Sequence, residues 1–270
     1  MQTPEKTGVE KDDPVLYRLI RWIVKRVFPK YELTGTENLP DEPCVIVSNH
    51  AQAYGVVAAE LYPPRPHYIW CTGEVLNRKE LPAYVMMDWW HMKPKAVRWL
   101  YRLFSHLIAR PLSYVLSHAH TIAVYHDARI VTTFRRSMEL LKAGADIVIF
   151  PESPEPYNGL IWKFHEHFPD LAKLYYRRTG TALRFVPMYI TPRLGRICFG
   201  EPVRYDPDAP DDEERTRICA AMMDAITDLA VSLPPHAVIP YPNIPKDQYP
   251  MNTDFTRNES DSEHNKTEVV

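Results

Sequence analysis

A histidine and an asparagine stand side by side where a short apolar segment of the chain ends. Residues 44–47 form this apolar run, typical of a buried β-strand, and Ser48, Asn49 and His50 follow it before the chain becomes polar. A side chain just after such a strand lies at the edge of a sheet. An imidazole with a pKa near neutrality can take the proton from a hydroxyl group that attacks an acyl carbon. His50 is therefore the first candidate for a catalytic base.

The elements that must position these residues form a regular pattern. Residues 121–125 read as a strand, residues 130–141 carry apolar side chains at helical spacing, and residues 147–150 read as a fully apolar strand. Strand, helix and strand at this spacing predict a βαβ unit with parallel strands. Further strands are predicted at residues 184–190 and 196–199. We therefore expect an α/β fold with a mixed, largely parallel sheet flanked by helices.

Four short motifs occur along the chain in a fixed order. They are the turn at residues 35–43, Ser48-Asn49-His50, Phe150-Pro151-Glu152 and Val186-Pro187-Met188. In the order and spacing of these motifs, residues 14–205 resemble the glycerolipid acyltransferase superfamily, the lysophosphatidic acid acyltransferase-like proteins. The resemblance implies a glycerol-3-phosphate acyltransferase-like fold and the transfer of a fatty acyl group from acyl-CoA or acyl-carrier protein to a hydroxyl group. His50 would be the general base, because a free hydroxyl is a poor nucleophile.

The chain departs from the pattern of that family at three places. The family has an aspartate five residues after the histidine, where this chain has Gly55, and an arginine that grips lipid phosphate, where this chain has His126. After the Phe-Pro-Glu motif the family has Gly-Thr-Arg, and this chain has Ser153, Pro154 and Glu155. Histidine is only partly charged at neutral pH, so phosphate has weaker partners here. We expect an acceptor other than plain lysophosphatidic acid, or an acceptor site that does not bind phosphate.

Without the usual aspartate, the imidazole of His50 needs a negative charge from elsewhere in the fold. Glu152 follows the neighbouring strand and is the expected partner, with Asp127 as a further candidate. Glu60 lies five residues beyond Gly55, about 140° around a helix, and is discounted. In a serine protease, loss of the orienting carboxylate lowers turnover about 10⁴-fold.

The other candidate residues near the ends of the predicted strands are expected to shape the acceptor pocket. They are Asn49, Gln52, Gly55, His126, Phe150, Pro151 and Ser153. Gln52 can also hydrogen-bond the ring, but a neutral amide does little for an imidazolium. Two functions stay open: an O-acyltransferase-like enzyme, and a catalytically impaired relative that binds lipid or acyl chains as a scaffold or regulator. Hydrolysis, with water as the acceptor, would use the same base.

The first helical segment of the chain, residues 14–30, is predicted to be amphipathic. Apolar residues recur on one side and cations gather on the other: Leu16, Ile20, Ile23 and Val27 against Arg18, Arg21 and Lys25. Residues 14–28 are suited to lying among the headgroups of an anionic membrane, and the alternative is a helix packed on the domain with a solvated basic face. With a polar N-terminus and no apolar run of about 18 residues, we expect a cytoplasmic protein that is peripheral on the inner face of the membrane. Residues 95–108 form a second helical pattern of mixed aromatic and cationic character.

The composition of the chain limits which partners, domains and cofactors are expected. The formal net charge of −2 argues against a nucleic-acid partner. The sequence predicts disorder over residues 1–13, an acyltransferase-like domain over residues 14–240, and a flexible polar tail over residues 241–270. No metal or redox cofactor is expected, because the four cysteines are far apart and the segment at residues 165–170 lacks the helical His spacing of zinc hydrolases.

Overall fold

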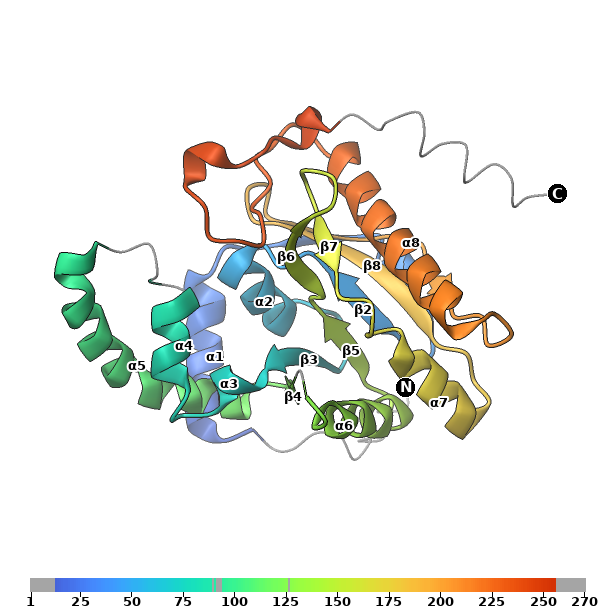
Figure 1. Ribbon diagram of the computed structural model, residues 1–270, viewed down its shortest axis with the longest axis horizontal. Coiled ribbons are helices and arrows are strands. Elements are labelled where there is room, and N and C mark those ends of the chain that lie inside the picture. The colour runs from blue at the N-terminus through green and yellow to red at the C-terminus, as the bar shows by residue number, and fades with distance from the viewer. Residues whose placement is uncertain (1–12, 89, 91–93, 126, 256–270) are drawn as a thin grey trace, which may run out of the picture.

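A mixed sheet organises the computed structural model, which describes residues 13–88, 90, 94–125 and 127–255 (Figure 1). The strand order is β1-β9-β8-β2-β5-β3-β4, with β10 also paired to β8. The neighbours β8, β2, β5, β3 and β4 run parallel, whereas β9 and β10 are antiparallel to β8. The strands are β1 Glu32–Thr34, β2 Val45–Ser48, β3 His67–Thr72, β4 Thr121–Val124, β5 Asp146–Ile149, β8 Arg184–Thr191, β9 Arg196–Phe199 and β10 Val203–Arg204. The predicted α/β fold with a mixed, largely parallel sheet is confirmed.

Helices cover both faces of the sheet. They are α1 Val15–Val27, α2 Gln52–Leu61, α3 Gly73–Leu76, α4 Leu81–Asp88, α5 Arg98–His118, α6 Ile130–Lys142, α7 Asp170–Thr179 and α8 Asp211–Ser232. Successive side chains of a strand point to opposite faces, so Val45 and Val47 join a core beneath α6, α7 and α8. Ile46 points the other way, to a core that includes Ala58 and Ala59 of α2. Burial on both faces explains why the central strands read as continuous apolar runs.

Two further strands extend from the end of β5. β6 Glu152–Pro156 and β7 Trp162–Phe164 pair antiparallel in a separate two-stranded sheet. The main-chain N–H of His165 donates to the carbonyl of Pro151 over 2.8 Å and closes the base of this hairpin. The hairpin therefore starts at the Phe-Pro-Glu motif.

The N-terminal helix is attached to α2 through Glu60, by both its carboxylate and its main chain. Glu60 accepts a hydrogen bond from the Tyr17 hydroxyl (2.9 Å), and Arg21 donates to the Glu60 carbonyl (3.1 Å). The sequence pattern placed Arg21 on a basic side of the helix that is free of contacts. In the structure Arg21 instead faces the protein. The predicted apolar stripe is left largely uncovered, with Leu16, Ile23 and Val27 exposed. Within the described residues, none of the helices combines the length and apolar character needed to cross a membrane.

The C-terminal segment, residues 241–255, differs from the predicted flexible tail. It contains two short 3₁₀ turns, Lys246–Gln248 and Asn252–Asp254, and Met251 forms a bridge with Ala237. Asn252 is buried and donates to the carbonyls of Ala230 and Leu233 at the end of α8. The segment packs on the domain because these hydrogen bonds fix it there. Residues 1–12 and 256–270, where disorder and the rest of the tail are predicted, lie outside the described residues.

Candidate functional site

The predicted site residues leave the sheet side by side. Val47 of β2 pairs in parallel with Ile149 of β5, so the residues that follow the two strands emerge at the same edge. Asn49 is buried there and bonded to β8 through both of its polar atoms. Its side-chain N–H donates to the carbonyl of Ile190 (3.1 Å), and its oxygen accepts from the N–H of Ile190 (2.8 Å). Asn49 thus fixes the start of the loop that carries His50.

The imidazole of His50 lies between two aromatic rings. The ring centroids of Phe150 and Tyr241 are 5.4 and 5.5 Å from it, both in edge contacts. Its Nδ1 is buried and has no hydrogen-bond partner among the described residues. Burial lowers the pKa of His50 to about 4, so the ring is neutral at pH 7. A hydrogen bond with the main chain of Gln52 opposes this shift, and no carboxylate contributes to it. The site therefore holds an imidazole that can accept a proton, without a carboxylate that stabilises the resulting imidazolium.

Glu152 reaches His50 at the main chain and not at the ring. One carboxylate oxygen accepts the backbone N–H of His50 over 2.5 Å, and the other accepts the backbone N–H of Trp162 over 3.2 Å. Burial raises the pKa of Glu152 to about 7, against the effect of these two hydrogen bonds. Sequence reasoning correctly expected the two residues to be neighbours, but the predicted hydrogen bond from the carboxylate to the imidazole is not formed. Glu152 instead ties the His50 loop to the β6–β7 hairpin.

The other candidate carboxylates are committed elsewhere. Glu60, at the far end of α2, accepts from Tyr17 and lies 3.3 Å from Nδ1 of His120. Asp127 binds Arg129 at the surface, and these hydrogen bonds lower the pKa of Asp127 to about 2. Neither residue supplies a negative charge to the ring of His50.

The turn after His50 has an unusual backbone. Ala51 and Gln52 have φ values of 43° and 54°, left-handed conformations that cost non-glycine residues on the order of 1–3 kcal/mol each. Helix α2 then begins and passes close to the loop. A Cβ atom at Gly55 would lie 2.1 Å from the carbonyl oxygen of His50. Glycine is needed at this position because the helix and the loop leave no room for a side chain.

The C-terminal segment covers this turn. The side-chain N–H of Gln52 donates to the carbonyl of Pro242 (3.3 Å) and to the hydroxyl of Tyr249 (3.2 Å). Together with the Tyr241 ring on His50, these contacts make residues 241–255 part of the rim of the site. Sequence reasoning missed this rim because the segment is polar and rich in Pro and Asn. Its two tyrosines, Tyr241 and Tyr249, were the residues of the rim that could have indicated packing on the domain.

The positions that grip phosphate in the resembled family have a different character here. Ser153 is buried and its hydroxyl accepts the N–H of Glu155 over 3.4 Å, within the β6 strand. Glu155 is exposed and lies 3.8 Å from Nζ of Lys163. His126 falls outside the described residues. The β6–β7 hairpin therefore places a carboxylate where the family has a cation.

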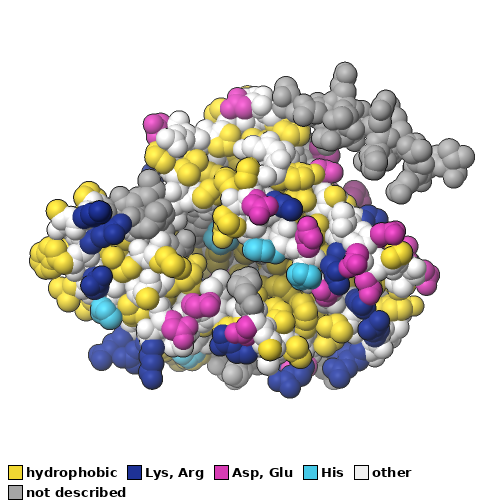
Figure 2. Space-filling view, in the orientation of Figure 1, with side chains coloured by type: hydrophobic (Ala, Val, Ile, Leu, Met, Phe, Trp, Pro, Cys, Tyr) yellow, Lys and Arg dark blue, Asp and Glu magenta, His cyan; other side chains and the backbone are white. Residues whose placement is uncertain are grey.

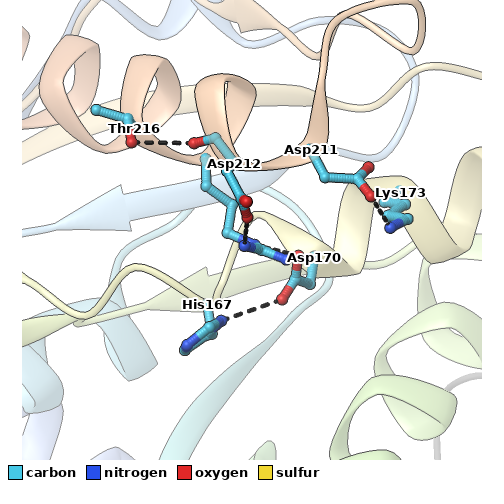
Figure 3. Close-up of polar contacts among 7 residues, drawn as sticks. His167, Asp170, Lys173, Asp211, Asp212 and Thr216 are labelled. Atoms are coloured by element: carbon cyan, nitrogen blue, oxygen red, sulfur yellow. Dashed lines mark hydrogen bonds and ion pairs between the residues drawn. The ribbon is translucent and has the colours of Figure 1, made fainter.

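The His165–Asp170 segment belongs to a surface network (Figure 3). Nδ1 of His167 lies 3.3 Å from Asp170, and Arg215 holds the other oxygen of that carboxylate over 2.7 Å. The Arg215–Asp170 pair joins α7 to the start of α8, and Arg215 also binds Asp212 within α8. No group of three His, Cys, Asp or Glu side chains in the described ranges is placed to hold a metal ion. The segment is explained by ion pairs between two helices.

Comparisons with known proteins find a distant likeness. No family model matches the chain, and no curated protein matches it. Among solved structures, the 1-acyl-sn-glycerophosphate (LPA) acyltransferase PlsC from Thermotoga maritima is similar, with a TM-score of 0.45 and 18% sequence identity over 79% of each chain.

Proposed function

We propose that this chain is an O-acyltransferase-like protein that moves a fatty acyl group from acyl-CoA or acyl-carrier protein to the hydroxyl group of a lipid or polyol. The observation that supports this most is the neutral imidazole of His50, half-buried at the edge where β2 and β5 end. The resemblance of the motif order to the glycerolipid acyltransferase superfamily supports the role of a general base for this imidazole.

The proposed reaction uses His50 twice. The acceptor oxygen attacks the thioester carbonyl carbon while the imidazole takes the hydroxyl proton. When the C–S bond breaks, the imidazolium returns that proton to the leaving sulfur, so the donor departs as a thiol and the base is regenerated. Glu152 would act by fixing the main chain of His50, which sets where the ring stands.

A second candidate function is favoured by the unpartnered Nδ1 of His50. A general base without a carboxylate partner gains little stabilisation as it becomes charged, and turnover falls steeply in such sites. The chain would then bind acyl chains or lipid without transferring them, as a scaffold or regulator.

Transfer assays separate the two functions. The full chain is incubated with labelled acyl-CoA or acyl-carrier protein and a panel of neutral lysolipids, glycols and lysophosphatidic acid, beside His50→Ala and the exposed control His167→Ala. We expect wild-type transfer that His50→Ala lowers about 10²–10⁴-fold and His167→Ala leaves unchanged. Equal transfer by His50→Ala would exclude this base. Saturable binding of acyl-CoA by wild type without transfer would establish the second function.

The choice of acceptor is tested in the same panel. Glu155 and the absence of the Gly-Thr-Arg sequence support an acceptor other than plain lysophosphatidic acid. We expect transfer to a neutral hydroxyl acceptor to exceed transfer to lysophosphatidic acid. The reverse order would show that phosphate is gripped by other residues.

We also propose that α1 holds the chain at the inner face of an anionic membrane. Leu16, Leu19, Trp22 and Ile23 are exposed on this helix, which contains no Asp or Glu. Replacing Arg18, Lys25 and Arg26 by Glu should abolish sedimentation with anionic vesicles, and Arg21 is left unchanged because it binds Glu60. Persistent binding would show that α1 does not anchor the chain.

A further inference from the structure

A second helix leaves a broad apolar face uncovered. Trp99, Leu103 and Leu107 recur every four residues along α5 and are 69%, 63% and 69% exposed. Leu100 and Phe104 extend the same strip and are 37% and 45% exposed. We call these five residues the α5 face. Contiguous apolar surface of this kind marks a binding surface, because soluble proteins rarely leave it open.

The rest of α5 already packs on the protein. Ser105 and Ala109 are buried on its inner side, and Ala109 joins a small core with Leu81 and Val85 of α4. The ring of Tyr101 packs on that of Trp90 at 5.0 Å. One side of α5 is therefore already packed on the protein, and the α5 face is a second apolar side that is exposed.

The charged side chains of α5 itself are all positive or titratable to positive. Residues 98–118 contain Arg98, Arg102, His106 and Arg110 but no Asp or Glu. The side chains of Arg102 and Arg110 form no hydrogen bond or ion pair with any described residue. Apolar residues flanked by arginines match an anionic bilayer, in which the apolar residues enter the interface and the cations meet phosphate. A second copy of the chain would instead bring arginines against arginines.

A groove beside the α5 face shows the same combination. It has a volume of about 470 Å³ between α4 and α5, and Leu103 and Leu107 line it together with the cations Arg78 and Arg110. A cation next to an apolar wall suits the junction between a lipid phosphate and its acyl chain.

The last residue of α5 contacts α1, whereas the α5 face occupies the first half of the helix. The ring of His118 in α5 is 6.1 Å from that of Tyr17 in α1, where the two helices meet. Figure 2 shows hydrophobic and Lys or Arg side chains gathered at the left end of the molecule, over the position that α5 occupies in Figure 1. From these observations we infer that the α5 face docks on an anionic phospholipid bilayer, as a second membrane contact besides α1. This contact does not require acyl transfer by the chain.

Vesicle binding tests the inference. The full chain is titrated with vesicles of phosphatidylcholine alone or mixed with phosphatidylglycerol, and bound protein is measured by sedimentation and by the blue shift of tryptophan fluorescence. The double variant Leu103→Glu/Leu107→Glu is compared with Val131→Glu, a matched change of an exposed apolar residue on α6. We expect the double variant to lower the partition coefficient for the mixed vesicles at least about tenfold, with Val131→Glu close to wild type.

A second, milder variant and a measurement of oligomeric state distinguish a loss of membrane binding from unfolding or dissociation. Arg102→Gln/Arg110→Gln leaves the apolar residues in place and should lower binding to the mixed vesicles severalfold, with little effect on phosphatidylcholine. Far-ultraviolet circular dichroism and light scattering establish that each variant is folded and report its oligomeric state.

Undiminished binding by both variants would overturn the inference, as would an equal loss in Val131→Glu. A wild-type dimer that the double variant dissociates, without a change in vesicle binding, would instead make the α5 face an interface between copies. Since α1 is untouched, failure here is distinct from failure of the α1 anchor or of acyl transfer.

Discussion

The surroundings of the His50 imidazole set the pH range in which it can act as a base. Burial lowers its pKa to about 4, and a general base works only when it is unprotonated. We therefore expect kcat/KM for acyl transfer to stay level from pH 8 down to about pH 5 and to fall through a midpoint near 4. A pH–rate profile checks this. A midpoint at 6.5 or above would mean that a carboxylate reaches the ring in the working enzyme.

The carboxyl group of Glu152 makes stability depend on pH in the opposite sense from carboxylates whose pKa is lowered by ion pairs. Its pKa is raised from 4.5 to about 7, so the stability it contributes is fully present below pH 4.5 and lost as pH rises through 7. Glu152→Gln removes this dependence. The free energy of unfolding, from urea titrations, should favour wild type over Glu152→Gln more at pH 5 than at pH 8. The exposed control Glu155→Gln should show no such change.

Gly55 is required by the backbone, which bears on any attempt to restore the family aspartate. A Cβ at this position would overlap the His50 carbonyl, and overpacking of this kind typically costs about 1–3 kcal/mol. Gly55→Asp should therefore lower the melting temperature without raising turnover. Gly55→Ala should be destabilised to a similar degree, because the Cβ and not the carboxylate causes the overlap. A stable, faster Gly55→Asp variant would show that α2 can move away from the loop.

At the level of whole elements, the C-terminal segment is secured by Asn252. Its side chain donates to two carbonyls at the end of α8 and accepts the N–H of His236 over 2.8 Å. Asn252→Ala should cost at least about 2 kcal/mol, because buried backbone groups lose their partners. Hydrogen exchange should rise across residues 236–255. The exposed control Asp247→Ala should leave exchange unchanged, and equal protection in both variants would show that other contacts hold the segment.

The elements that could be predicted are those whose burial leaves a recognisable pattern of apolar residues in the sequence. The strands ending at Ser48 and Ile149 are apolar runs, so the sheet and the meeting of His50 with Glu152 followed from them. The atom of His50 that Glu152 binds could not be predicted, because it depends on how the loop turns through two left-handed residues. Periodicity likewise predicted an apolar stripe on α1, but not that Tyr17 and Arg21 would hold its other side to the protein.

On the scale of the molecule, charge is distributed unevenly despite a net value of only −2. Helices α1 and α5 contain no acidic residue, whereas α8 begins with four acidic residues in its first turn. Binding to anionic vesicles should therefore weaken as salt is raised, since the Debye length shortens from about 30 Å at 0.01 M to about 10 Å at 0.1 M. Sedimentation across a salt series checks this. Binding that ignores salt would be driven by the apolar residues alone.

The residues that meet around His50 come from distant parts of the chain, which has a consequence for the synthesis of the protein. Gln52 and Pro242 are 190 residues apart, yet they are bonded over the same turn. During translation the sheet edge and its imidazole leave the ribosome long before the tyrosines that enclose them. The rim of His50 is therefore complete only once residues 241–249 have been made, and cleavage of the chain near residue 240 would leave these contacts without a covalent link to the domain.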